Sequence, residues 1–435
     1  MTETRDTTEA VDTADVTEAL AGPTEYGPPD FTYLHMDTAS RPMHWSMVLE
    51  IAGGDTLLGI DEIRDRVRSR VGRYDVFGVG VRGGRWRRPE IVRTPADAID
   101  IDRHVEAVEV ADPTARDRAI AELCATHLRR PDPFWHITLM TIVDSGEQLM
   151  VLRVHHSLSD GLAGAAFAAL LADGTPEQLA EFDRFATSPR FRVGDIDPQV
   201  LADARAAHGE QWKAGRSGRG WPALTTSGRR EIATVSVSTR DLRRVAKRHG
   251  ATVHEFVLGA VGATLSAHPP SENGPETIRV TLPATLDPTF RHTGNAVSVT
   301  LLNLAGSDTD LGRQIERSRE QLSLIESRRA ALALAATGHP SPPWPVMRAI
   351  VGASMSRMAP DIHIGVNPGF SRVRSVLGRR IVALTPLSPL GGYSFSVTSL
   401  ILGDRTTFGV VTDPQALPGY AARFAAAFDE VLTTP

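Results

Sequence analysis

Strand patterns and helical patterns alternate along this chain, in two series separated by a weakly patterned stretch, and this order limits the possible folds most. In the first series, residues 46–51 and 148–154 are rich in aliphatic side chains and predict strands. Between them, apolar residues of 60–71 recur on one face of a predicted helix. Asp112-Pro113 is typical of a helix start, because aspartate caps and proline suits the first helical position. Interleaved strands and helices predict an α/β (α+β) fold in which helices cover sheets.

The second series begins with a predicted strand at 231–237 and a capped helix after Ser238. The further predicted elements are a helix over 252–267, strands over 278–284 and 296–303, a long helix over 311–336, and strands over 393–402 and 406–412. Between the two series, residues 173–230 are broken by prolines and offer little to bury. We therefore expect an N-terminal domain over 31–172, a connection over 173–230 and a C-terminal domain over 231–435.

Composition restricts the function classes, since 435 residues suffice for two domains. The first thirty residues contain eight carboxylates and one arginine, which predicts a disordered acidic tail over 1–30 and not a signal peptide. The single cysteine, Cys124, cannot form an internal disulfide, so we expect a reducing, cytoplasmic location. The net charge of -5 argues against nucleic-acid binding. The longest stretch of small apolar residues, 161–172, contains no charge but is far shorter than the roughly 20 residues that cross a bilayer.

The segment His155-His156-Ser157-Leu158-Ser159-Asp160-Gly161 follows a predicted strand and precedes a predicted helix of small residues, a place where functional side chains are often displayed. Adjacent residues of a strand point to opposite faces, so only one of the two histidines can face a given pocket. An imidazole titrates near neutrality and can take a proton from an attacking hydroxyl or amine. Asp160 can orient an imidazole or hold the turn, and Gly161 permits a close backbone approach. Because the histidines diverge, we expect no metal site formed by His155, His156 and Asp160.

The string His-His-x-x-x-Asp-Gly resembles the active-site motif of a superfamily of acyl-CoA-dependent acyltransferases and peptide-synthetase condensation domains, and within it the wax ester synthase/diacylglycerol acyltransferase branch. Similar segments extend over most of residues 31–435. They are 37–43, 99–105 (the branch's "fD-x-x-x-H-V"), 132–135 (its Pro-Leu-Trp), 250–258, 294–298 ("G-N-x-v-S") and, loosely, 366–369.

The resemblance implies two chloramphenicol-acetyltransferase-like domains with mixed sheets and a tunnel between them, with the motif at its centre. His156 is then the general base, Asp160 holds the loop without touching substrate, and His155 packs behind the base. The branch's Asn-Asp pair is replaced here by His254-Glu255. The residues that we consider as oxyanion or active-site support are accordingly His254, Ser394 and Ser396, beside a backbone N–H near Gly161.

The sequence thus predicts an O-acyltransferase that moves a fatty acyl group from acyl-CoA, a co-substrate, to an alcohol: a long-chain alcohol, a diacylglycerol or a metabolite hydroxyl. No cofactor is expected to be bound. Two alternatives remain open, a condensation-type enzyme that takes its acyl group from a carrier protein, and a non-catalytic relative that binds acyl ligands. A lipid acceptor would also suit a peripheral position at the inner membrane face.

Overall fold

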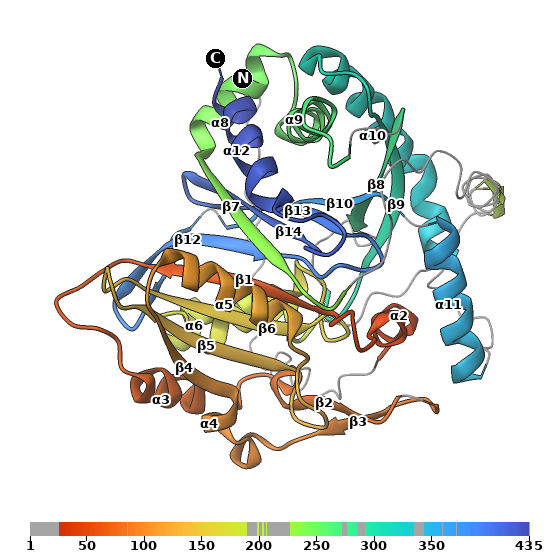
Figure 1. Cartoon of the computed structure of the whole chain (residues 1–435). Coiled ribbons are helices and arrows are strands. Elements are labelled where there is room, and N and C mark those ends of the chain that lie inside the picture. The colour runs from red at the N-terminus through yellow and green to blue at the C-terminus, as the bar shows by residue number, and fades with distance from the viewer. Residues whose placement is uncertain are drawn as a thin grey trace, which may run out of the picture.

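The computed structural model describes residues 26–84, 86–188, 227–271, 276–285, 292–334, 343–358, 360–370 and 372–434, with five isolated positions between 198 and 206. Two mixed six-stranded sheets organise these residues (Figure 1). The predicted mixed-sheet α/β class is confirmed.

The first sheet has the strand order β11-β12-β1-β6-β5-β4. Its strands are β1 (His44–Ile51), β4 (Val105–Val110), β5 (Trp135–Ile142), β6 (Gln148–His155), β11 (Ser375–Val376) and β12 (Arg379–Leu387). Only β4 and β5 pair in parallel; the other neighbours are antiparallel. β11 and β12 come from the second half of the sequence, and Figure 1 shows β12 lying beside β1. The first sheet is therefore completed by a segment that the sequence analysis assigned to the C-terminal domain.

The second sheet has the order β7-β14-β13-β10-β8-β9. Its strands are β7 (Glu231–Ser238), β8 (Thr277–Thr285), β9 (Val297–Ala305), β10 (Ile362–Val366), β13 (Phe395–Leu402) and β14 (Arg405–Thr412). β10 runs parallel to both of its neighbours, so this sheet is also mixed. A Cβ at Gly409 of β14 would lie 2.0 Å from the carbonyl oxygen of Pro386 in β12, so glycine allows the two sheets to approach closely here.

Helices cover both sheets. In the first half these are α2 (Pro28–Met36), α3 (Ile60–Arg70), α4 (Ile101–His104), α5 (Pro113–Ala125) and α6 (Pro176–Leu179), with the 3₁₀ helices η1 (Asp75–Gly78), η2 (Ala96–Ala98), η3 (Ala163–Leu170) and η4 (Ala180–Phe185). In the second half they are α8 (Thr239–Arg248), α9 (Val253–Ala267), α10 (Leu311–Leu334), α11 (Trp344–Met358) and α12 (Tyr420–Thr433). A small hairpin joins β2 (Val79–Arg82) and β3 (Glu90–Arg93).

Alternation along the strands separates the two faces of each sheet. On the second sheet, Phe395 and Phe408 pack with Phe424 and Phe428 of α12, in a core that also includes α8 and α9. Burying each such side chain stabilises the fold by about 1.5–3 kcal/mol. The opposite face of this sheet is therefore turned away from α8, α9 and α12, and carries a different set of side chains.

Two predicted boundaries are wrong. The predicted tail ran through residue 30, but α2 begins at Pro28 and Asp30 is 1% exposed. The predicted connection began at residue 173, but Phe182 and Phe185 are buried in the first core. In both places a proline occupies the first helical position, Pro28 in α2 and Pro176 in α6, where no backbone N–H is needed. Residues 1–25 and most of 189–226 lie outside the described residues, and the remaining domain division stays a prediction.

Candidate active site

His155 ends β6 and points into the first half of the molecule. It is 3% exposed and its ring stacks on Phe134, with the ring centroids 4.5 Å apart. The Ser157 backbone N–H donates to Nδ1 over 3.1 Å, which assigns the proton of the neutral ring to Nε2. That nitrogen faces Asp37 Oδ2 at 3.6 Å. Burial, first of all, lowers the pKa of His155. Both nitrogens are therefore turned to the protein interior; that His155 packs behind a catalytic base stays a prediction.

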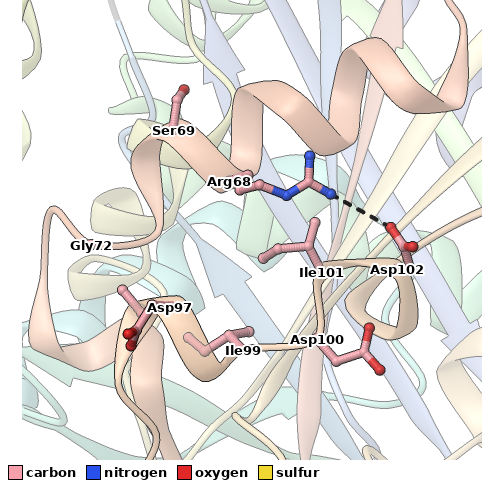
Figure 2. A pocket seen from close by; sticks show the side chains of 9 residues that line it. Arg68, Ser69, Gly72, Asp97, Ile99, Asp100, Ile101 and Asp102 are labelled. Atoms are coloured by element: carbon pink, nitrogen blue, oxygen red, sulfur yellow. Dashed lines mark ion pairs between the residues drawn. The ribbon is translucent and has the colours of Figure 1, made fainter.

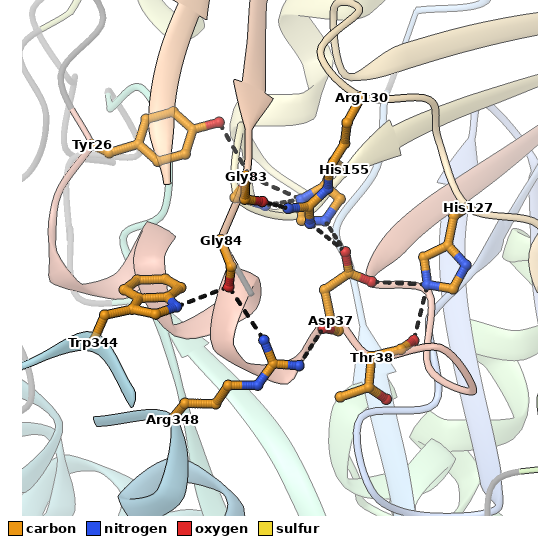
Figure 3. Close-up of polar contacts among 11 residues, drawn as sticks. Tyr26, Asp37, Thr38, Gly83, Gly84, His127, Arg130, His155, Trp344 and Arg348 are labelled. Atoms are coloured by element: carbon orange, nitrogen blue, oxygen red, sulfur yellow. Dashed lines mark hydrogen bonds and ion pairs between the residues drawn. The ribbon is translucent and has the colours of Figure 1, made fainter. Parts of the chain in front are cut away.

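Asp37 gathers the polar groups behind the motif (Figure 3). Arg130 pairs with Oδ2 at 2.7 Å and His127 with Oδ1 at 3.2 Å. Burial alone would raise the pKa of this carboxyl, but hydrogen bonds from His127 and His155 and the Arg130 charge hold it well below its usual range. The hydrogen bond to Asp37 in turn raises the pKa of His127.

The same cluster reaches two further elements. Arg130 donates to the Gly83 carbonyl at 2.6 Å, and the neighbouring Gly84 carbonyl accepts from Trp344 Nε1 at 2.8 Å and from Arg348 at 3.3 Å. The β2–β3 hairpin and α11 are therefore tied to the back of the motif, as Figure 3 shows.

His156 points the other way and is only partly buried. Its ring stacks on Tyr33 of α2, with centroids 3.7 Å apart and an interplanar angle of 11°. Its Nδ1 lies 3.1 Å from Asn295 Oδ1. Burial lowers the pKa of His156 below its ordinary value, although the nearby Asp160 charge opposes that shift. The ring is therefore neutral near pH 7.

The amide of Asn295 is fixed in orientation. Its Nδ2 donates to Asp30 Oδ1 at 2.8 Å and to the His156 carbonyl at 2.7 Å, so Oδ1 must face the imidazole. An amide oxygen accepts but does not donate, which assigns the proton of neutral His156 to Nδ1. The lone pair is then on Nε2, the nitrogen from which a base can act.

Asp160 joins the two halves of the chain. Its Oδ1 accepts from the Leu162 and Ala163 backbone N–H groups at 3.0 and 2.9 Å. Its Oδ2 accepts from His292 Nε2 and the Ala296 backbone N–H, both at 2.9 Å. Burial would raise the pKa of this carboxyl, but the His292 contact and the backbone donors lower it. All of these contacts hold the loop, and the sequence did not indicate His292 as the partner.

The other predicted site residues, Gly161, Ser394, Ser396 and His254, differ in their surroundings. Gly161 is exposed, and a Cβ there would meet only Asn367 Oδ1, at an ordinary 3.8 Å, so the protein's own atoms do not require glycine. Ser394 and Ser396 are 6% and 0% exposed, and both hydroxyls have no hydrogen-bond partner among the described residues. His254 lies in the first turn of α9, which packs against α10 and α12, and no described contact links it to the motif.

A second histidine lies across from the motif. His363 of β10 is 8% exposed, and its Nδ1 lies 3.1 Å from Thr281 Oγ1. It stacks on Tyr393, with centroids 5.4 Å apart. Burial and then the charge of His156 lower the pKa of His363 to about 3. Sequence analysis missed His363 because it lies within an ordinary buried strand.

Sequence analysis also gave no role to Asp30, Tyr33 or Asn295. Asn295 stood in a quoted motif segment, whereas Asp30 was assigned to the acidic tail. A signal was available for the start of α2: Gly27, whose backbone N–H donates to Asp30 in the first turn, followed by Pro28 at its first position. That pattern predicts a helix start, and so an ordered segment, ahead of residue 31.

A described cleft lies away from the motif. It has a volume of about 650 Å³ and is lined by Arg68, Ser69, Gly72, Ala96, Asp97, Ile99, Asp100, Ile101 and Asp102 (Figure 2). It contains no residue of the motif. In the described ranges no group of three metal-ligating side chains occurs, and no described helix is both long and apolar enough to span a membrane.

Known proteins are similar to this chain in sequence and in fold. Residues 27–214 match the model of the wax ester synthase/diacylglycerol acyltransferase catalytic domain. A Mycobacterium tuberculosis protein that carries the name diacylglycerol O-acyltransferase is 26% identical over 448 residues, which cover 89% of this chain and 86% of that relative. The wax ester synthase/diacylglycerol acyltransferase from Marinobacter aquaeolei VT8 matches with a TM-score of 0.67 at 17% identity, over 94% of this chain and 98% of the other.

A condensation domain is similar as well. The first condensation domain of the calcium-dependent antibiotic synthetase matches with a TM-score of 0.58 at 17% identity, over 95% of this chain and 96% of that one. Fold and motif together define an acyltransferase with a condensation-like fold. The chain is thus similar to wax ester synthase/diacylglycerol acyltransferases, in sequence over the catalytic-domain match at residues 27–214 and in fold over nearly its whole length.

Proposed function

We propose that this acyltransferase moves an acyl group from acyl-CoA to an alcohol hydroxyl, with His156 as the general base. One observation supports this most: the Asn295 amide oxygen holds the proton of neutral His156 on Nδ1 and leaves Nε2 free to accept another. A base must be neutral before it can accept a proton, and burial of His156 favours the neutral ring by lowering its pKa.

The proposed reaction is a direct transfer without an acyl-enzyme. His156 Nε2 takes the acceptor's hydroxyl proton while the oxygen attacks the thioester carbonyl. The new C–O bond gives a tetrahedral intermediate, whose collapse breaks the C–S bond. The imidazolium then gives its proton to the departing thiolate, so the products are an ester and free CoA thiol. Holding base and acceptor together supplies much of the rate enhancement.

Three further residues are proposed as positioning residues. Tyr33 stacks on the base, Asp30 fixes the Asn295 amide, and Asp160 joins the motif loop to residues 292–296. Both carboxylate oxygens of Asp160 accept hydrogen bonds from backbone N–H groups and His292. Asp160 is therefore proposed to hold the loop in place and not to contact substrate.

The oxyanion of the tetrahedral intermediate needs an N–H or O–H group that is not already hydrogen-bonded within the protein. Ser394 meets this condition, as does a backbone N–H near the exposed Gly161. Ser396 also has an unpaired hydroxyl, but it pairs in register with His363 and is not proposed as the oxyanion donor. His254 is not proposed for this role, because α9 packs against α10 and α12.

The test is release of free thiol from acyl-CoA by the purified protein, with long-chain alcohols and diacylglycerols as acceptors and mass detection of the ester. We expect acceptor-dependent release that His156→Ala lowers by about 10²–10⁴-fold. His254→Ala is the matched control and should leave the rate unchanged. Release that survives His156→Ala would refute the proposed base.

A parallel reaction offers the same acyl groups on a phosphopantetheinylated carrier protein. Turnover with carrier-bound donors alone would replace acyl-CoA with a carrier protein as the donor. This second reaction separates the two donor classes that the sequence left open. His156 is the proposed base with either donor, so the His156→Ala variant alone would not distinguish them.

A further inference from the structure

Three residues form a polar row across neighbouring strands of the second sheet. His363 of β10 pairs in register with Thr281 of β8 on one side and with Ser396 of β13 on the other. Paired residues of neighbouring strands project to the same face of a sheet. The residues that alternate with this row, such as Ile362 and Phe395, pack in the core under α9 and α12. The row therefore lies on the opposite face, away from those helices.

The polar row faces the motif. The charge of His156 is the one interaction, besides burial, that shifts the pKa of His363. Tyr393, which stacks on His363, also lies beside α2: a Cβ at Gly391 would come 3.5 Å from the Tyr393 hydroxyl and 3.0 Å from Met36 Cε. α2 is the helix whose Tyr33 stacks on His156. The stacking and these close approaches place the row on the side of the sheet that faces α2 and the base.

The polar row is not satisfied by the protein. Ser396 is completely buried, yet its hydroxyl has no partner among the described residues. His363 uses Nδ1 towards Thr281, and its Nε2 has no described partner. Buried polar groups are almost always hydrogen-bonded, because leaving one unpaired costs free energy. The simplest explanation for the unpaired Ser396 hydroxyl and His363 Nε2 is that a bound ligand supplies the missing hydrogen bonds.

Resting on the proposed function, we infer that Ser396 and His363 bind a second hydrogen-bonding group of the acceptor, next to the hydroxyl that is acylated. The substrate class is then an alcohol with a neighbouring polar group, of the 1,2-diol type, and not a plain alkanol. The attacking hydroxyl lies within hydrogen-bond distance of His156 Nε2, so groups facing that base meet the acceptor atoms beside it. In a 1,2-diol the second oxygen is on the adjacent carbon, whereas the first amide of a pantetheine arm is separated from the reacting carbonyl by the sulfur and two methylenes.

The test compares kcat/KM for 1,2-dodecanediol and 1-dodecanol with one acyl-CoA. We expect the diol to be preferred on the order of tenfold, which is what one hydrogen bond contributes. Ser396→Ala should remove most of that preference by lowering the value for the diol alone. His363→Phe keeps a ring of similar size but no nitrogen, and should act in the same direction.

Thr300→Val is the matched control. Thr300 is also buried with an unpaired hydroxyl, but it pairs with Leu282, which packs in the core under the helices, so it lies on the other face of the sheet. Its removal should leave the ratio between the two alcohols unchanged. Ser396→Ala and Thr300→Val should both keep the melting temperature of the parent, because neither hydroxyl has a partner to lose.

Four outcomes overturn the inference. Equal kcat/KM for both alcohols in the parent shows that no second group is recognised. An equal loss for both alcohols in Ser396→Ala makes Ser396 an oxyanion donor instead, and a raised KM for acyl-CoA with either acceptor assigns the row to the donor. In these three cases the proposed function stands. No thiol release with either alcohol by the folded parent protein, when longer alcohols and diacylglycerols also fail, overturns both proposals.

Discussion

The surroundings of His155 and His156 differ although the two residues are adjacent. His155 faces a buried carboxylate, Asp37, whose other partners carry charge, and its Nδ1 accepts from Ser157. His156 faces a neutral amide and a stacked tyrosine, and its amide partner comes from residue 295 in the other half of the chain. The comparison teaches that strand alternation turns the two rings to opposite sides but does not by itself say which of them is the candidate base. What makes a histidine a candidate base is the nitrogen that its neighbours leave unbonded.

The largest expected effect separates these two roles directly. His156→Ala should lower kcat by about 10²–10⁴-fold with little change in the melting temperature, because the ring is only partly buried. His155→Ala should instead lower the melting temperature, since it opens a cavity beside Phe134 and leaves Ser157 without its acceptor. Steady-state kinetics and thermal melts of both variants check this. The comparison fails if His155→Ala lowers kcat as far as His156→Ala does in a protein of unchanged stability.

The two buried carboxylates extend the comparison. Asp160→Ala should destabilise the fold by about 3–5 kcal/mol, because His292 and three backbone N–H groups lose their acceptor in the interior. Asp37→Ala should have a smaller effect, about 1–3 kcal/mol, since Arg130 and His127 are exposed enough to be hydrated instead. Urea unfolding of both variants measures the difference. An effect of Asp37→Ala that exceeds that of Asp160→Ala would contradict this ranking.

Asn295→Ala tests whether the tautomer of His156 matters. Without the amide oxygen, nothing described holds the proton on Nδ1, and we expect kcat to fall on the order of 10²-fold. The expected fall is smaller than that of His156→Ala, because the base itself remains. Kinetics with one acceptor and a melting curve suffice, and a variant with unchanged kcat would show that Asn295 only joins the two halves.

Sequence reasoning found the class of fold, most strands, the motif and the fact that only one of its two histidines can face a given pocket; the role of each histidine came from the family resemblance and stays a prediction. Those features follow from local periodicity and from alternation along one strand. It missed Asp30, Asn295, His292 and His363 as partners of the motif, because their meeting is set by how the two sheets pack and not by spacing along the chain. It also proposed His254, whose helix packs on the other face of the second sheet. Buried side chains that act through distant partners leave no local pattern.

A smaller effect is expected in the pH dependence of activity, which should follow the protonation of His156. Burial lowers the pKa of His156 below 6.5, so the active neutral form persists to more acid pH than for an exposed histidine. The acid limb of kcat/KM should therefore have its midpoint below pH 6.5, with a plateau from there to about pH 8. A profile between pH 4 and pH 8 measures it. A midpoint above 6.5 would show that the ring is protonated more easily than its surroundings imply.

The smallest effect is expected for His127, which contacts Asp37, the carboxylate that His155 also faces; it concerns the pH dependence of stability. The pKa of His127 is raised by Asp37, so its stabilisation is fully present below about pH 6.5 and is lost as pH rises through the raised value. His127 is 38% exposed, and solvent therefore keeps the effect to a few tenths of a kcal/mol. His127→Gln should lower the melting temperature slightly at pH 6 and not at pH 9. A larger loss at pH 9 would reverse the assigned sign.

The pairing of β12 with β1 has a consequence for how this chain is made. β1 spans His44–Ile51, but its antiparallel neighbour β12 spans Arg379–Leu387, so one edge of β1 stays unpaired until the ribosome has made that later segment. An unpaired strand edge is a template for wrong pairing between chains. Non-local pairing of this kind also slows folding, because a long loop must close first. A fragment that stops at residue 172 is accordingly expected to aggregate, and the first sheet is completed only after β12 has been made.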